Sequence, residues 1–441
     1  MTFNSAVFLF CFLPSALLLY RLGSSEKYKN ILLCILSLVF YAFGQIKYVP
    51  LFLLSVAINY TAGLILKNKK SSGILAFAVF LNVAILCTFK YLPEMGVSGI
   101  ELPIGISFFT FQGLSYVIDT YRDKNYGTSD FMKVFLYISF FPRLIAGPIV
   151  KYHEIEDQLT CRECTDEKTS RGICRFIFGM AKKLLISENC AKIANTVFDN
   201  GTGDFRLAWL GAAAYMLELY YDFSAYSDMA IGTGMMFGFI FPENFDHPYS
   251  SASIKEFWRK WHISLSSWFK EYVYIPLGGN RKGKTRAAIN RMIVFLLTGI
   301  WHGGRLTYVV WGLGHGLLSS AEDFGIIPVK KLEKSKTGKI LLHVYTLLAV
   351  CLLFVVFRAS SLGDAFKLIS VMFTGSTCEG YTIASLLTPA AVAALIASIV
   401  FAPKKYDIPE KASYIISIPL LILCIMAMAK GNFSPFIYMQ F

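Results

Sequence analysis

Long apolar runs recur along this chain from residue 5 to residue 430, and the polar intervals between them are short. About 20 apolar residues in helical conformation cross the hydrocarbon core of a bilayer. The pattern therefore predicts an all-α polytopic membrane protein. The run 364–374 is too short to span and is expected to be interfacial or re-entrant. The expected spans are 5–20, 29–46, 49–66, 72–90, 103–120, 131–149, 174–197, 206–240, 287–321 as two segments, 338–357, 384–401 and 413–429.

The composition agrees with this pattern. Hydrophobic residues make up 55% of the chain and charged residues only 16%, against roughly a quarter charged in soluble domains, and the mean hydropathy is +0.53. We expect one integral membrane domain over 1–441, with N-terminal transmembrane helices in 1–120, a core that carries the chemistry in 131–324 and an aromatic tail in 433–441. The first run is expected to be a retained helix, because no Lys or Arg precedes it.

The net charge of +13 is concentrated in a few connections, at 67–70, 281–291, 330–339 and 404–405. In membrane proteins such basic segments mark the cytoplasmic side. Counting spans from them predicts that both termini lie outside. Nucleic-acid binding is not expected, because no soluble basic domain exists to carry it.

His302 is the most informative residue of the sequence. An apolar helix expected to start near Ala287 ends around it, and 11 residues separate it from Arg291, the last charge of the basic loop. That separation is about 16 Å along a helix, near the middle of a core about 30 Å thick. An imidazole at this depth is a functional candidate, suited to act as a general base on a hydroxyl. A buried histidine bonded to a carbonyl is the structural alternative.

Five other histidines are less informative. His262 belongs to an aromatic and basic stretch, 257–265, that resembles an interfacial amphipathic helix. It is either a second site residue or an amphipathic side chain at the interface. His315 is expected to pack against its helix neighbours. The remaining three, His153, His247 and His343, give no clear signal.

Three further patterns are set aside. Residues 278–285 match the phosphate-binding loop G-x-x-x-x-G-K-[ST], but no series of alternating strands and helices accompanies them. Glu218 and Asp222 lie one helical turn apart, and structural pairing with Arg or Tyr is favoured over a metal site. Cys161 and Cys164 form a single CxxC pair, which is weak evidence for zinc. No metal site is therefore expected.

Several motifs together resemble one known family. They are Trp258-Arg-Lys-Trp-His-Ile-Ser-Leu-Ser266, Tyr274-Ile-Pro-Leu-Gly-Gly-Asn280, Gly299-Ile-Trp-His-Gly303, Leu102-Pro-Ile-Gly-Ile-Ser-Phe-Phe-Thr-Phe-Gln112, Phe140-Phe-Pro-Arg-Leu-Ile-Ala-Gly-Pro148 and Tyr220-Tyr-Asp-Phe-Ser-Ala-Tyr-Ser-Asp-Met-Ala230. In combination they resemble the membrane-bound O-acyltransferase (MBOAT) family, and within it the bacterial alginate O-acetylase type.

The resemblance implies a ring of about 11–12 tilted transmembrane helices, with re-entrant or interfacial helices around a thin central floor. It implies an enzyme of the bacterial cell membrane that moves an acetyl group from cytoplasmic acetyl-CoA, or another acyl thioester, toward an extracytoplasmic polysaccharide. His302 matches the family's catalytic histidine and His262 its second one. No bound cofactor is expected. An exported, esterase-like protein is the partner that the resemblance suggests.

Further residues are candidates around this centre. The basic loop residues Arg281, Lys282 and Lys284 are expected either to attract the anionic donor or to set the topology. Asn280, Trp301 and Arg143 are expected to shape the site or to contact the donor.

The tail Phe433-Ser-Pro-Phe-Ile-Tyr-Met-Gln-Phe441 resembles a motif in which a tyrosine carries the acyl group. Tyr438 is therefore a candidate relay, with an aromatic anchor in the membrane interface as the alternative.

Two other functions remain open from the sequence. One is direct acylation of a lipid or of a peptidoglycan sugar. The other is a transporter whose midplane histidine handles protons or substrate.

Overall fold

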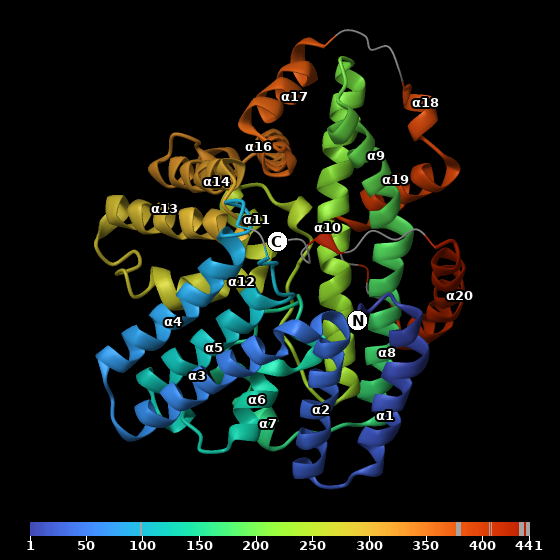
Figure 1. Ribbon diagram of the computed structural model, residues 1–441. Coiled ribbons are helices and arrows are strands. Elements are labelled where there is room, and N and C mark those ends of the chain that lie inside the picture. Colours follow the sequence, from blue (N-terminus) through green and yellow to red (C-terminus); the bar gives the residue numbers. More distant parts are fainter. Residues whose placement is uncertain (98, 376–380, 405, 407, 432–435, 438–441) are drawn as a thin grey trace. The chain divides into compact units, whose positions relative to one another are not determined.

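The computed structural model describes every residue except 98, 376–380, 405, 407, 432–435 and 438–441 (Figure 1). Among the described residues all regular structure is helical, and no strand occurs. The predicted all-α fold is therefore confirmed. The chain packs as two compact units, Met1–Met180 with Tyr226–Glu243, and Ala181–Ala225 with Asn244–Ile437. The single domain over 1–441 and its predicted subdivisions stay predictions.

The first unit contains the N-terminal helices. Their bounds are α1 Leu13–Leu22, which continues a π-helical turn Phe8–Phe12, α2 Glu26–Gln45, α3 Val49–Asn68, α4 Ser72–Tyr91, α5 Ile106–Arg122, α6 Phe131–Ser139, α7 Tyr152–Thr160 and α8 Asp166–Ala181. Helix α5 packs against α3 and α4. Between α3 and α4, the buried amides of Asn59 and Asn82 donate to each other's oxygens at 3.1 and 3.0 Å. Such polar pairs hold helices together where apolar surface alone does not distinguish helix from lipid.

The second unit begins as a continuation of α8 through a π-helical turn, Lys182–Ser187. Helix α10 runs across the boundary between the two units. The helices of this part are α9 Glu188–Asn200, α10 Phe205–Met236, α11 Ile254–Lys260, α12 Ile263–Phe269, α13 Gly283–His302, α14 Leu306–Phe324, α15 Val329–Leu332, α16 Lys336–Arg358, α17 Leu362–Thr374, α18 Ile383–Leu386, α19 Pro389–Phe401 and α20 Glu410–Ala429.

Three predicted helices differ from the structure. The span 131–149 is wrong: α6 ends at Ser139, because Pro142 and Pro148 interrupt the helical backbone that would follow. The span 384–401 is divided into α18 and α19, with Pro389 as the first residue of α19. The amphipathic helix 257–265 is also divided, into α11 and α12, and His262 lies between them.

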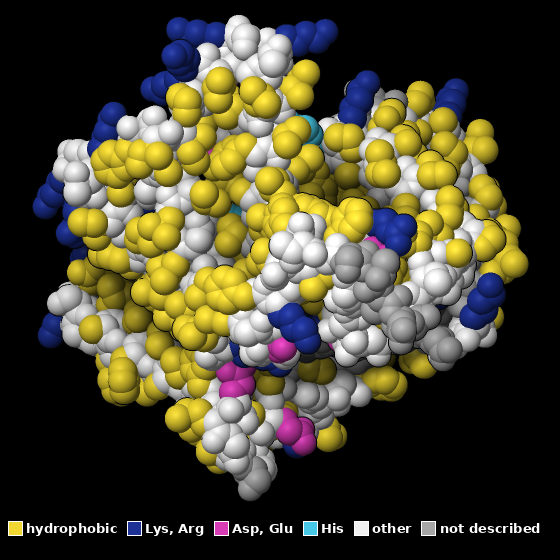
Figure 2. Space-filling view, turned by 90° about the horizontal axis from the view of Figure 1, so that it is seen from above, with side chains coloured by type: hydrophobic (Ala, Val, Ile, Leu, Met, Phe, Trp, Pro, Cys, Tyr) yellow, Lys and Arg dark blue, Asp and Glu magenta, His cyan; other side chains and the backbone are white. Residues whose placement is uncertain are grey.

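The apolar surface agrees with a membrane protein. Among the described residues, four helical segments are long and apolar enough to cross a bilayer: Glu26–Asn68, Ser72–Tyr91, Lys336–Arg358 and Glu410–Ala429. Large apolar side chains on them are exposed, for example Phe80 on α4 at 65% and Ile415 on α20 at 70%. Figure 2 shows hydrophobic side chains over much of the face in view. Lipid is the environment in which such a surface is stable. The number of about 11–12 transmembrane helices and their arrangement in a ring stay predictions.

Helices α13 and α14 form the closest helix pair of the second unit, and they lie side by side in Figure 1. A Cβ atom on Gly299 of α13 would lie 2.5 Å from the carbonyl oxygen of Tyr308. One on Gly312 of α14 would lie closer still to the carbonyl oxygen of Phe295. The two glycines therefore let the two backbones touch, as small residues do between membrane helices.

We expect Gly312→Ala to destabilise the protein, because the added methyl group meets a carbonyl oxygen that belongs to a helix backbone. Overpacking of this kind costs about 1–3 kcal/mol. Thermal unfolding of the detergent-solubilised protein measures it. The control is Gly73→Ala in α4, where the added atom meets only the Ser71 hydroxyl at 3.8 Å. Equal melting temperatures for both variants would contradict the close packing.

Candidate active site

His302 is the last residue of α13, and its side chain is 3% exposed. Gly303 ends the helix and lets the chain turn back into α14. The turn is short, so the first residues of α14 lie beside the end of α13. The sequence-predicted central histidine is thus enclosed within the second unit.

Aromatic rings surround the imidazole of His302. The ring centroids of Trp311 and Phe357 lie 5.2 and 5.0 Å away, both at 87° to it. Trp301 lies 4.8 Å away. These edge-to-face contacts hold an aromatic ring in a defined orientation. The surroundings also exclude bulk water, which a site that handles a hydrolysable acyl donor requires.

His262 occupies the break between α11 and α12 and has a left-handed backbone, with φ of 43°. This conformation is strained for a residue that is not glycine, and such strain is concentrated at functional sites. The side chain is 1% exposed. Its ring lies 4.6 Å from that of Phe223, edge to face.

Asn244 determines which nitrogen of the neutral His262 ring carries the proton. Its Oδ1 accepts hydrogen bonds from the backbone N–H and the hydroxyl of Ser264, at 3.2 and 2.8 Å. The backbone donor identifies this atom as an oxygen, so the contact with His262 Nδ1 at 3.1 Å needs a proton on that nitrogen. In the neutral ring Nε2 is then the basic nitrogen. Nothing in the sequence around Asn244 signals this role.

Trp301 lies next to both histidines. Its ring centroid is 6.3 Å from that of His262 and 4.8 Å from that of His302. The structure therefore brings together three of the residues that the sequence singles out. That Trp301 shapes the site stays a prediction.

One face of α14 lies next to His302 at its N-terminal end and next to a cavity at its C-terminal end. Tyr308, Trp311, His315 and Ser319 are all buried and are spaced by three or four residues, so they share that face. The ring centroids of Tyr308 and Trp311 lie 6.2 and 5.2 Å from that of His302. The stretch from Tyr308 to Ser319 covers about 16 Å. Ser319 lines the cavity.

His315 lies in the middle of this face and is fully buried. Its ring centroid is 5.3 Å from that of Trp311 and 5.2 Å from that of Trp258. Trp258 also lines the cavity. His315 therefore packs against its neighbours, as predicted, and of these neighbours Trp258 lines the cavity while Trp311 contacts His302.

The cavity has a volume of about 680 Å³ and lies among α11, α12, α13 and α14. We call it the basic cavity. Its charged lining residues are Lys255, Arg259, Lys270, Lys284, Arg291 and Asp323. Asp323 is ion-paired with both Lys255 and Arg291. The excess of cations attracts anions, and the low-dielectric walls strengthen the attraction.

Some of the residues predicted for donor binding line this cavity, and others do not. Lys284 and Asn280 line it. Arg281 and Lys282 are exposed and are not among its lining residues. Arg143 belongs to the first unit, where its buried guanidinium donates to the carbonyl oxygens of Tyr137 and Val150.

The loop before α13 shows why the sequence requires glycine there. Gly278 and Gly279 have φ of 106° and 56°, which L side chains rarely adopt. The Asn290 amide donates to the carbonyl of Gly279 at 2.9 Å and so fixes the loop. Helical turns, and no strand, precede this described loop, so it lacks the strand that a phosphate-binding loop of the nucleotide-hydrolase type requires.

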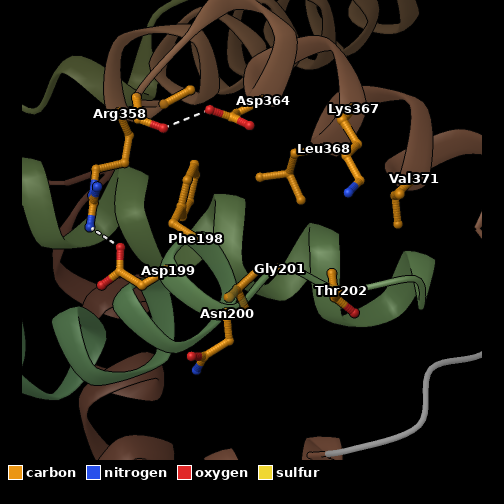
Figure 3. A pocket seen from close by; sticks show the side chains of 13 residues that line it. Phe198, Asp199, Asn200, Gly201, Thr202, Arg358, Asp364, Lys367, Leu368 and Val371 are labelled. Carbon is orange, nitrogen blue, oxygen red and sulfur yellow. Dashed lines mark hydrogen bonds and ion pairs between the residues drawn. The ribbon is translucent and has the colours of Figure 1, made fainter.

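A second cavity of about 430 Å³ lies between the end of α9, the end of α16 and α17 (Figure 3). We call it the α9–α17 cavity. Arg358 lines it, and its side chain is directed toward Asp199, with which it is ion-paired at 3.0 Å. The Ser360 and Ser361 hydroxyls donate to Asp364 and hold the pKa of this exposed carboxyl below its usual value. None of the sequence-predicted site residues lines this cavity.

The candidate relay, Tyr438, lies outside the described residues. The two residues before it, Phe436 and Ile437, are described and contact the second unit.

Comparison with known proteins extends these observations. The profile of the MBOAT, membrane-bound O-acyltransferase family, matches residues 42–362. A probable alginate O-acetylase of Pseudomonas syringae pv. tomato is 40% identical over 85% of this chain and 75% of its own. A probable alginate O-acetylase of Azotobacter vinelandii is 36% identical over the whole of both chains. A peptidoglycan O-acetyltransferase of Helicobacter pylori is 34% identical over 84% of this chain and 79% of its own. This chain, a membrane-embedded acyltransferase, therefore belongs to the membrane-bound O-acyltransferase family.

Proposed function

We propose that this enzyme transfers an acetyl group from cytoplasmic acetyl-CoA across the membrane toward hydroxyls of an extracytoplasmic polysaccharide, with His302 as general base. One observation carries the proposal: His302 lies at the end of a buried α14 face that begins at the basic cavity. A charged donor head is attracted at one end of this face, and a basic nitrogen is available at the other.

The chemistry follows from a neutral imidazole. The ring of His302 takes the proton of the acceptor hydroxyl while that oxygen attacks the thioester carbonyl. The tetrahedral intermediate collapses, the carbon–sulfur bond breaks, and the imidazolium returns the proton to the leaving sulfur. The products are an ester and free coenzyme A, and no bound cofactor or metal takes part.

The basic cavity supports an anionic thioester as donor. Phosphate groups suit a cavity lined by Lys and Arg. The rings of Trp258, Trp311 and Phe357 are unsuited to charge, and they are proposed to lie along the path of an uncharged chain that ends in an acyl group. The phosphates of the donor therefore stay in the cavity while the thioester reaches His302.

His262 is proposed to assist His302 through Trp301 as a positioning residue. The Nδ1–H donated to Asn244 keeps Nε2 basic, so the ring is able to accept a proton. Its fixed orientation between α11 and α12 supports a role in proton movement.

The proposals about the acceptor are supported by the relatives and by the C-terminal tail. Alginate O-acetylases and a peptidoglycan O-acetyltransferase are among the relatives, so the acceptor is proposed to be a polysaccharide, and a peptidoglycan sugar is the second candidate. Tyr438 is proposed to carry the acetyl group to an exported, esterase-like partner. The enzyme is proposed to lie in the bacterial cell membrane with both termini outside.

The test of His302 is a labelled acetyl-CoA assay with purified protein. We expect His302→Ala to lose about 10²–10⁴-fold in transfer, the contribution of a general base. His302→Gln keeps polar contacts without a base and is expected to lose as much. His343→Ala, on α16 away from these rings, serves as the folded control. Turnover close to wild type in either His302 variant would contradict the assignment.

The donor site is tested by two neighbouring lysines at the start of α13. Lys284 lines the basic cavity, and Lys282 does not. We expect Lys284→Gln to raise KM for acetyl-CoA about five-fold, equivalent to roughly 1 kcal/mol, with little change in kcat. Lys282→Gln is expected to leave KM unchanged. Equal effects of the two substitutions would mean that this basic segment acts only through its total charge.

The role of His262 is tested through its partner. Asn244→Ala removes the acceptor from Nδ1, and we expect turnover to fall about ten-fold, roughly 1.4 kcal/mol. Asn244→Asp keeps an acceptor oxygen and is expected to retain more activity than the alanine variant. Wild-type turnover in Asn244→Ala would show that the orientation of His262 is not needed.

A further inference from the structure

A buried ion-pair cluster in the second unit is not used by the mechanism above. Lys183 Nζ lies 2.7 Å from Asp222 Oδ1 on α10 and 2.7 Å from Glu188 Oε1 on α9. The three side chains are 2%, 1% and 8% exposed. Buried charges are costly even when paired, and replacing them with apolar groups is often neutral or stabilising. Their presence calls for a reason beyond stability.

The backbone at Lys183 is also unusual. The residue lies in the π-helical turn Lys182–Ser187, which interrupts the continuous helix from α8 to α9. Such turns are rare and occur frequently at functional sites. This turn directs the ammonium group of Lys183 toward α10 and into the interior.

The C-terminal segment contacts both members of the Lys183–Asp222 pair. The backbone N–H of Ile437 donates to Asp222 Oδ2 at 2.8 Å. The ring of Phe436 is 1% exposed, and Lys183 Nζ lies 5.0 Å from its centroid. The carboxylate thus holds Lys183 with one oxygen and the segment with the other, while the ammonium faces the aromatic ring.

These contacts distinguish a binding site from simple packing. A charge-assisted hydrogen bond to a backbone N–H fixes the path of the chain whatever the side chain is. The cation–π contact with Phe436 adds selectivity for an aromatic residue one position earlier. Together they determine the position of two consecutive residues, and Tyr438 is the next residue in the sequence.

We propose that Lys183 and Asp222 form an internal binding site for the chain's own C-terminal segment, Phe436–Ile437, and that they are positioning residues for Tyr438. The proposal rests on the relay assigned to Tyr438 in the proposed function. Binding of the segment is nevertheless measurable without any acetyl transfer, which separates the two ideas.

Hydrogen–deuterium exchange of the full-length protein in detergent tests the binding. We expect the C-terminal peptide to exchange at least ten-fold faster in Asp222→Ala than in wild type, because the Ile437 amide loses its acceptor. A peptide from α13 is the internal control for folding and is expected to exchange as in wild type. Unchanged exchange of the C-terminal peptide would overturn the binding site.

Ile437→Pro tests the positioning role, since it removes the backbone donor and leaves the Lys183–Asp222 pair intact. We expect acetylation of the cellular product to fall at least ten-fold. Ile437→Val keeps the N–H and is expected to behave as wild type. Normal acetylation in Ile437→Pro, with loss in Tyr438→Phe, would overturn the positioning role and leave the relay standing.

Two further outcomes separate the proposals. Normal acetylation in both Tyr438→Phe and Ile437→Pro would overturn the relay and with it the positioning role. Faster exchange in Asp222→Ala would then still support the internal binding site. Full transfer by His302→Ala would overturn the proposed chemistry without affecting the exchange result.

Discussion

An imidazole enclosed by indole and phenyl rings is the constraint on which the active site depends. In apolar surroundings an ionisable side chain is kept only where protein encloses it and fixes its contacts. For His302 that enclosure comes from the end of α13, the first turns of α14 and the last turn of α16. Helices α13 and α14 lie together at this histidine because Gly299 and Gly312 let their backbones touch. Close helix packing is therefore a condition for the chemistry.

The same rule explains the other buried polar groups. The His262 ring has Asn244, the Asn59 amide has Asn82, and the Asp222 carboxylate has Lys183 together with a backbone N–H. Each contact joins residues that belong to different elements. A polar contact in a low-dielectric interior is strong when satisfied and costly when broken. Such pairs therefore specify which elements meet, where apolar contacts with lipid or protein are nearly equivalent.

Much of this arrangement was predictable from local sequence. The apolar runs predicted most helices, and the 11 residues between Arg291 and His302 marked this histidine as a functional candidate. The break at His262 was not predictable, because neither Trp261 nor His262 disfavours a helix strongly. Two side-chain pairs were not predictable, because each joins positions far apart in the sequence: Asn244 with His262, and Lys183 with Asp222. The second pair depends in addition on a π-helical turn.

The position of the basic cavity relative to His302 matters for how donor binding relates to catalysis. Trp258 lines the basic cavity, its ring centroid lies 5.8 Å from that of Trp311, and the Trp311 centroid lies 5.2 Å from that of His302, so aromatic rings lie between the cavity and the imidazole. Under the proposed function, an anionic donor is held at the cations, where water solvates its charge, and an uncharged arm extends toward the rings, which are unsuited to charge. An anion that lacks such an arm is then expected to bind the cations without reaching His302. On that proposal, different residues set the affinity for the donor and the reactivity of the acyl group, and the length of the donor becomes part of its recognition.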